Sequence, residues 1–205
     1  GQSPVNGGAR ERRAFRVSGI VQGVGFRPFV YRLAAKYGLG GWVLNDGAGV
    51  GIEAEGASAV LDDFADALCA EAPLAASVTA VSYSDITPQG EEAFRILESP
   101  QGAEARTLVS PDLAVCADCR REILSAADRR HGYAFTNCTN CGPRYSIIRG
   151  VPYDRPLTSM APFRMCPACQ HEYDAPADRR FHAQPNACAA CGPAYRLLVN
   201  GGVQA

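Results

Sequence analysis

Eight cysteines in the second half of the chain constrain its fold more than any other feature. The 205-residue sequence contains nine cysteines, and all except Cys69 belong to C-x-x-C pairs. The pairs are Cys116/Cys119, Cys138/Cys141, Cys166/Cys169 and Cys188/Cys191. Two thiolates at this spacing can bind one metal ion from a tight turn, and two such turns complete a tetrahedron. The second half is therefore expected to fold around metal ions.

The cysteine pairs also form an internal repeat. Eighteen residues separate the two pairs within each unit, and the two units lie fifty residues apart. Other matches fall in the same register: residues 127–130 with 177–180, residues 141–143 with 191–193, and Tyr145 with Tyr195. Such self-similarity indicates duplication of one structural unit, which is a much stronger signal than a single C-x-x-C.

The metal most consistent with this pattern is zinc. Four soft thiolates per unit favour zinc among the abundant metals, and they leave no open coordination position, so two structural ions are expected. The spacing belongs to the zinc-ribbon class. One ion per repeat is the simplest pairing, and a crossed pairing between repeats stays open. Disulfides and an iron–sulfur cluster are the alternatives. No secretory signal opens the sequence, which favours the cytoplasm over an oxidising compartment.

The first half has a different pattern, in the order β-α-β-β-α-β. We expect strands over residues 15–21, 42–44, 50–55 and 78–86, with a possible edge strand over 94–97. A helix is expected to start at Pro28 and to end at Gly38, and a second to span residues 60–69. The order is typical of the ferredoxin-like α+β fold, with one sheet and two helices on one face.

This contrast divides the chain. We predict a tail over residues 1–11, a first domain over 12–99, a linker over 100–110 and a double-finger domain over 111–200. Cys69, on the apolar face of the second helix, is expected to be a buried, inert thiol. The three histidines, His131, His171 and His182, are expected to be polar surface residues.

The turn between the first strand and the first helix has the composition of an anion site. Glycines there allow main-chain N–H groups to point inward, and the helix adds the positive end of its dipole. An arginine just before the helix supplies donors that match phosphate geometry. The expected phosphate-binding residues are Gln22, Gly23, Val24, Gly25, Phe26 and Arg27. Because the first and third strands should pair antiparallel, Asn45 is expected to lie beside this turn.

Residues 21–27, followed by residues 41–45 and Gly49, resemble the acylphosphatase signature. The resemblance covers residues 12–98. It implies that Arg27 and the main-chain amides of the turn hold the phosphoryl group. It also implies that Asn45 orients the attacking water through its side-chain oxygen, so Arg27 and Asn45 are the candidate catalytic residues.

An acylphosphatase-like domain followed by two four-cysteine fingers resembles the HypF family of hydrogenase-maturation carbamoyltransferases. Residues 151–156 and 181–185 also carry this resemblance. It implies that the whole protein takes carbamoyl phosphate and ATP and passes the carbamoyl group to the C-terminal cysteine of a HypE-type partner. The chain is then expected to be an N-terminal fragment that hydrolyses carbamoyl phosphate, with ATP needed only by the missing C-terminal domains.

Two other functions stay open. The chain could be a stand-alone acylphosphatase with a metal-binding tail, or a zinc-ribbon module that binds nucleic acid or protein. Nucleic acid is an unlikely partner, because the net charge is −1 and acidic residues interrupt the finger arginines. No apolar run approaches the length of a membrane span, so no membrane association is expected.

Overall fold

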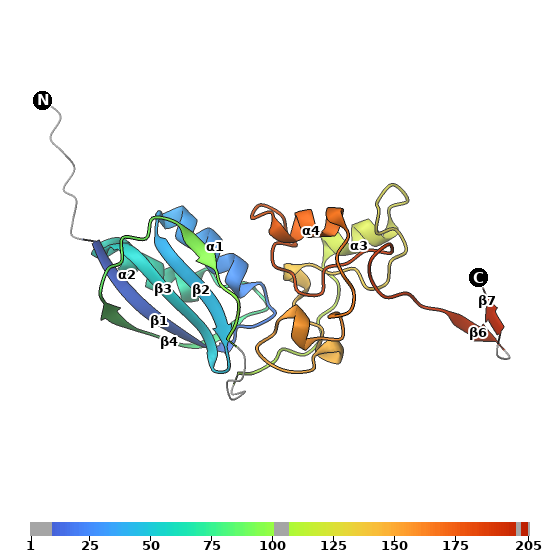
Figure 1. The fold of residues 1–205 in the computed structure, drawn as a ribbon, viewed down its shortest axis with the longest axis horizontal. Coiled ribbons are helices and arrows are strands. Elements are labelled where there is room, and N and C mark those ends of the chain that lie inside the picture. Colours follow the sequence, from blue (N-terminus) through green and yellow to red (C-terminus); the bar gives the residue numbers. More distant parts are fainter. Residues whose placement is uncertain (1–9, 101–106, 200–201, 205) are drawn as a thin grey trace, which may run out of the picture.

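The computed structural model describes residues 10–100, 107–199 and 202–204. Two units lie side by side, a sheet with two helices and a compact unit with short helices (Figure 1). The linker proposed at residues 100–110 includes residues 101–106, which lie outside the described part of the chain, as do residues 1–9 of the predicted tail.

The first unit is a five-stranded sheet in the order β4-β1-β3-β2-β5. Strand β1 pairs antiparallel with both β3 and β4, and β5 pairs parallel with β2. The strands are β1 (Arg10–Ile20), β2 (Gly40–Asp46), β3 (Gly49–Ala57), β4 (Ser77–Ile86) and β5 (Phe94–Ile96). The expected α+β fold is confirmed, and β1 starts two residues before the predicted start of the domain.

Helices α1 (Phe26–Tyr37) and α2 (Ser58–Ala70) cover the sheet and bury its apolar side chains. Phe15 of β1 packs edge-on against Phe64 of α2, with ring centroids 5.6 Å apart. The prediction for Cys69 is wrong, because its side chain is exposed. Leu61, Phe64 and Leu68 already form the buried stripe of α2 at helical spacing, and Cys69 lies outside that stripe.

Helix α1 starts at Phe26, two residues before the expected start at Pro28. The main-chain N–H of Phe29 donates to the carbonyl of Gly25 at 3.0 Å, and this is the first bond of the helix. Pro28 fits within the first turn because the first N–H groups of a helix need no partner inside it. Arg27 is therefore a residue of the first helical turn. Gly38 ends the helix with a φ of 64°, as predicted.

The second unit shows the duplication in its backbone. Helix α3 (Ala117–Leu124) and helix α4 (Pro167–Asp174) have the same length and are offset by fifty residues. Each is preceded by a cysteine in almost the same extended conformation, Cys116 and Cys166. Three 3-10 turns lie between the two helices: Thr139–Cys141, Tyr145–Ile147 and Arg155–Leu157. The hairpin of β6 (Leu197–Val199) and β7 (Gly202–Gln204) extends away from the fingers (Figure 1).

Candidate functional site

The turn from β1 to α1 has the geometry of an anion cradle. Gly23 and Gly25 have φ values of 72° and 77°, in the left-handed region that strongly favours glycine. Within the described residues, no acceptor receives the main-chain N–H groups of residues 23–27. Several of these residues line one small cavity at the positive end of the α1 dipole. Free amides at a helix start are a ready-made site for a phosphate.

Arg27 and Asn45, the two predicted catalytic residues, lie in contact at this cavity. Both side chains are buried, with 7% of Arg27 and 1% of Asn45 exposed. With its amide oxygen facing Arg27, Asn45 accepts hydrogen bonds from Nε at 3.1 Å and from Nη2 at 3.2 Å. This orientation follows from the donors around the amide. The first strand–helix turn and the β2–β3 hairpin thus meet where the topology predicted.

Two details of Asn45 differ from the sequence expectation. Asn45 lies in strand β2 opposite Val50, and the turn that follows contains only Gly47 and Ala48. The oxygen expected to orient the water accepts from Arg27 instead. The Nδ2 group of Asn45 is therefore the part of its side chain that is left to hold a water molecule.

The second unit packs directly onto the cradle through Tyr153 and Asp154. The main-chain N–H of Tyr153 donates to Oε1 of Gln22 at 2.9 Å. The Nη2 atom of Arg27 donates to the Tyr153 carbonyl at 3.3 Å and lies 2.6 Å from Oδ1 of Asp154. The amide nitrogen of Gln22 donates to the carbonyls of Asp46 and Gly49, so one side chain links the cradle, the hairpin and the fingers.

The cavity beside Arg27 is formed by both units. Its volume is about 20 Å³, close to the space that one water molecule needs. Gly23, Arg27 and Asn45 line it from the first unit, and Tyr153, His182 and Gln184 line it from the fingers. The glycines allow this close approach, because a Cβ atom on Gly23 would lie 2.7 Å from Cβ of Pro143.

Sequence reasoning missed the finger residues of this site. Tyr153 and Asp154 belong to residues 151–156, and His182 and Gln184 belong to residues 181–185. Both stretches carried the resemblance to HypF and were given no role. His131 and His171 are exposed as expected, whereas His182 is half-buried at the cavity. Burial and the charge of Arg27 lower the pKa of His182 to about 4.

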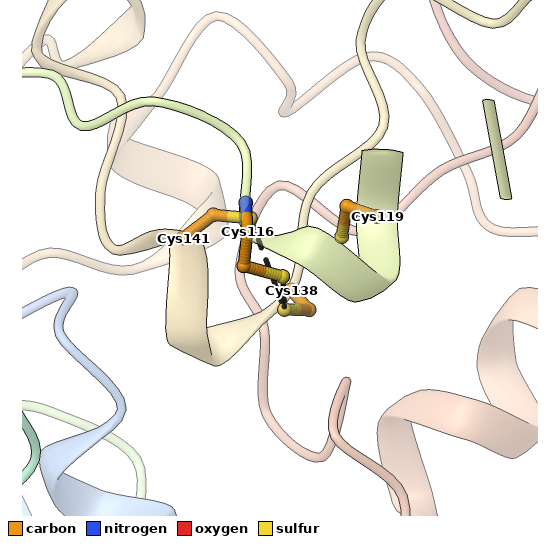
Figure 2. Close-up of side chains that lie close together, drawn as sticks. All are labelled: Cys116, Cys119, Cys138 and Cys141. Carbon is orange, nitrogen blue, oxygen red and sulfur yellow. Dashed lines mark hydrogen bonds between the residues drawn. The ribbon is translucent and has the colours of Figure 1, made fainter. Parts of the chain in front are cut away.

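The eight paired cysteines form two clusters, each within one repeat. Figure 2 shows the first cluster, in which Cys116 precedes α3 and Cys119 lies in its first turn, while Cys138 precedes a 3-10 turn and Cys141 is its last residue. Within each cluster the sulfur atoms all lie within 4.8 Å of one another. All nine cysteines are free, so neither cluster is a pair of disulfides. Because each cluster takes all four cysteines from one repeat, the crossed pairing is excluded.

The sulfur spacing fits a tetrahedral metal ion. In the first cluster, Sγ of Cys138 lies 3.6 Å from that of Cys116 and 3.9 Å from that of Cys141. In the second, Sγ of Cys188 lies 3.8 Å from those of Cys166 and Cys191, and Sγ of Cys191 lies 3.7 Å from that of Cys169. A tetrahedron with a zinc–sulfur bond of about 2.3 Å has edges of about 3.8 Å. The donor set and its geometry therefore suit one zinc ion per finger.

Arginines of each finger contact the cysteines of the other finger. Nη1 of Arg129 donates to Sγ of Cys169 at 3.3 Å, and Nη1 of Arg179 donates to Sγ of Cys119 at 3.2 Å. Charged donors offset the negative charge that four thiolates and a divalent ion would carry. The two cysteine clusters thus share one interface between the repeats.

Two glutamates hold these arginines in place. Glu172 forms ion pairs with Arg129 and Arg130, and Glu122 forms the equivalent pairs with Arg179 and Arg180. Burial raises the pKa of Glu172, but hydrogen bonds from Arg130 and Arg129 outweigh it and lower the pKa to about 2. These four arginines form ion pairs at the contact between the two fingers, which weakens the nucleic-acid alternative.

Family models match both units. The Acylphosphatase model matches residues 13–96, and the HypF finger model matches residues 115–148 and 165–198.

Among the helices of the described residues, none has the length and apolar character that a membrane crossing requires.

Curated relatives fall into two groups. The chain is 52% identical to Carbamoyltransferase HypF2 of Cupriavidus necator over 154 residues, which are 74% of this chain and 19% of that protein. It is 49% identical to Acylphosphatase of Thermotoga maritima over 82 residues, which are 40% of this chain and 90% of that protein. The chain therefore spans about a fifth of the length of the carbamoyltransferases that it matches.

Solved structures agree with this division. A full-length HypF in the phosphate- and nucleotide-bound form matches 91% of this chain, with a TM-score of 0.85 and 44% identity. HypF of T.kodakarensis matches 95% of the chain, with a TM-score of 0.82 and 42% identity. The chain covers 25% and 24% of those two proteins.

Proposed function

The chain belongs to the HypF family, matching the N-terminal part of its members, and we propose that it hydrolyses carbamoyl phosphate at the cradle of residues 22–27. The observation that supports this best is the contact between Arg27 and Asn45 beside a turn of free amide groups. Carbamoyl phosphate is an acyl phosphate, so the name of the carbamoyltransferase relatives and the acylphosphatase domain favour the same substrate.

In the proposed reaction, Arg27 and the amides of residues 23–27 hold the phosphoryl group while Asn45 positions a water molecule. The water oxygen bonds to phosphorus as the bond from phosphorus to the carbamoyl oxygen breaks, and the electron pair leaves with carbamate. Both water protons end on the phosphate, so carbamoyl phosphate dianion and water give carbamate and dihydrogen phosphate. Because carbamate is a good leaving group, positioning and charge stabilisation suffice without a general base.

The proposal also includes metal ions and partners. Two zinc ions, one in each four-cysteine cluster, would hold the fingers folded and would take no part in the chemistry. ATP use and transfer of the carbamoyl group to a HypE-type acceptor are proposed for the whole protein only. A cytoplasmic location is proposed from the same family membership. A stand-alone acylphosphatase remains the second candidate, supported by the match to 90% of the length of such enzymes.

Phosphate release from carbamoyl phosphate by the wild-type chain, Arg27→Ala and Asn45→Ala tests the proposal. Loss of a preorganised donor costs about 2–4 kcal/mol of barrier, so turnover should fall by roughly 30-fold to 1,000-fold in either variant. Arg27→Ala should also lose inhibition by inorganic phosphate, whereas Asn45→Ala should keep it. Arg32→Ala, on the exposed side of the same helix, is the matched control and should stay active. Near-normal turnover by Arg27→Ala would refute the proposal.

A further inference from the structure

His182 has an unusual backbone conformation beside the proposed phosphate site. Its φ is 54°, and among the described residues it is the only one other than glycine with a positive φ. Histidine tolerates this left-handed region better than most residues, but glycine is favoured there. Residues other than glycine in such a backbone conformation cluster at functional sites.

The other repeat shows that the backbone does not require a histidine here. Fifty residues earlier, Gly132 has a φ of 67° and donates its N–H to the carbonyl of Ile123 at 2.8 Å. His182 donates its N–H to the carbonyl of Tyr173, the equivalent residue, at 2.9 Å. Glycine therefore makes the same main-chain hydrogen bond in the first finger. The backbone of the second finger does not need the imidazole of His182 for this bond.

The imidazole is held at the cavity without a hydrogen-bond partner from the described residues. Its ring packs against the rings of Tyr173 and Phe181, with centroid distances of 4.9 Å and 4.7 Å. Because burial and Arg27 lower the pKa of His182, the ring is neutral at pH 7. A neutral imidazole offers one donor and one acceptor, so each ring nitrogen can hydrogen-bond a ligand.

His182 also lies between two cavities. The small cavity of about 20 Å³ contains the Arg27–Asn45 contact, and a larger cavity of about 860 Å³ lies between the two units. Arg27, His182 and Gln184 line both cavities, so they form the wall that divides them. An acyl group extending from a phosphate at the cradle toward the fingers would meet this wall.

We propose that His182 is the specificity-determining residue of the site: it hydrogen-bonds the carbamoyl group of the substrate and excludes larger acyl groups. The inference rests on the proposed function. A carbamoyl group offers an N–H₂ donor and a carbonyl acceptor, so it can pair with either ring nitrogen. A benzoyl group is larger than a carbamoyl group, and with His182 in place it cannot extend into the larger cavity.

Kinetics with three acyl phosphates test this role in His182→Gly, a substitution that suits a φ of 54°. For the wild-type chain, kcat/KM should follow the order carbamoyl, acetyl, benzoyl phosphate. Loss of one buried hydrogen bond in His182→Gly should lower kcat/KM for carbamoyl phosphate about tenfold. Opening the wall should raise kcat/KM for benzoyl phosphate by at least about tenfold, since the larger cavity then accepts the ring.

Two further variants make the result interpretable. His131→Gly removes an exposed histidine next to the equivalent position and should match the wild type. If His182→Gly fails to fold, His182→Asn keeps a residue that tolerates left-handed backbone and removes most of the ring. An unchanged ratio of carbamoyl to benzoyl hydrolysis in the folded variant would overturn the role of His182 alone. Absence of hydrolysis of all three substrates by the wild type would instead overturn the proposed function, and the role of His182 with it.

Discussion

Arg27 is the residue on which the proposed site depends, and Asp154 controls how much of its charge faces a substrate. The carboxylate of Asp154 lies 2.6 Å from Nη2 of Arg27, and both side chains are largely buried. A phosphate that approaches the cradle must therefore share the guanidinium with this carboxylate. In water such a pair would matter little, but burial strengthens it.

Replacement of Asp154 should accordingly strengthen phosphate binding. In Asp154→Asn, the inhibition constant of inorganic phosphate against carbamoyl phosphate hydrolysis should fall about fivefold, which corresponds to roughly 1 kcal/mol. Asp66→Asn removes an exposed carboxylate from α2 and is the charge-matched control. A higher inhibition constant in Asp154→Asn would mean that Asp154 mainly holds Arg27 in position.

Motif spacing and strand order were sufficient to predict that Arg27 and Asn45 lie close together. Arg27 and Asn45 come from one antiparallel arrangement, in which strand pairing brings a turn and a hairpin together. Asp154 and His182 could not be predicted in this way, because they lie in irregular segments of the other unit. No hydrophobic period shows which surface such segments will contact.

At the scale of elements, α3 and α4 are the centre of the finger unit. Each helix carries a glutamate, Glu122 or Glu172, that receives the arginine pair of the other repeat. Those arginines also donate to cysteine sulfur across the interface. A metal ion in one finger alone would lack this charge compensation, so we expect the two repeats to fold as a pair.

Loss of these cross-repeat contacts should weaken metal binding in the opposite finger. Partners of metal ligands typically contribute 10- to 100-fold to metal affinity. In Arg179→Ala we therefore expect roughly one metal ion per chain to transfer to a chelator at least about tenfold faster. Arg121→Ala is the control, because among the described residues its exposed side chain pairs only with Asp118 of its own helix. Equal transfer rates in both variants would show that the Arg179–Cys119 contact does not stabilise the metal site.

The residue pattern predicts most of these elements but not all of their limits. The cysteine register favoured one cluster per repeat and left a crossed pairing open, and the structure places each cluster within its own repeat. Helix α1 begins earlier than Pro28 because Gly25, in left-handed conformation, already accepts the first helical bond. Cys69 is exposed because an apolar residue at the end of a helix need not share the buried stripe.

At the scale of the whole molecule, the packing of the fingers onto the cradle defines the proposed active site. Gly23 is a point of close approach, since a Cβ there would lie within about 3 Å of atoms of both Pro143 and Tyr153. The stand-alone acylphosphatase that this chain matches aligns over only 40% of the chain. A covered cradle is therefore a property of the two-domain arrangement.

A single methyl group should disturb this packing. Gly23→Ala should increase the radius of gyration measured by small-angle X-ray scattering, because the added Cβ separates the two units. Gly38→Ala has nearly the same left-handed strain, worth about 1–2 kcal/mol, but a Cβ there meets nothing within 4 Å. Gly38→Ala should therefore lose stability without a change in dimensions. Equal radii for the two variants would argue against close packing at Gly23.

The proposed chemistry is tested most directly by the fate of isotopic oxygen. If water attacks phosphorus at the cradle, hydrolysis of carbamoyl phosphate in H₂¹⁸O should place one ¹⁸O atom in each phosphate that the chain releases, as mass spectrometry can detect. That labelled phosphate should disappear in Arg27→Ala. Release of unlabelled phosphate by the wild-type chain would contradict the account, because the bond between carbon and oxygen, rather than that to phosphorus, would then be broken.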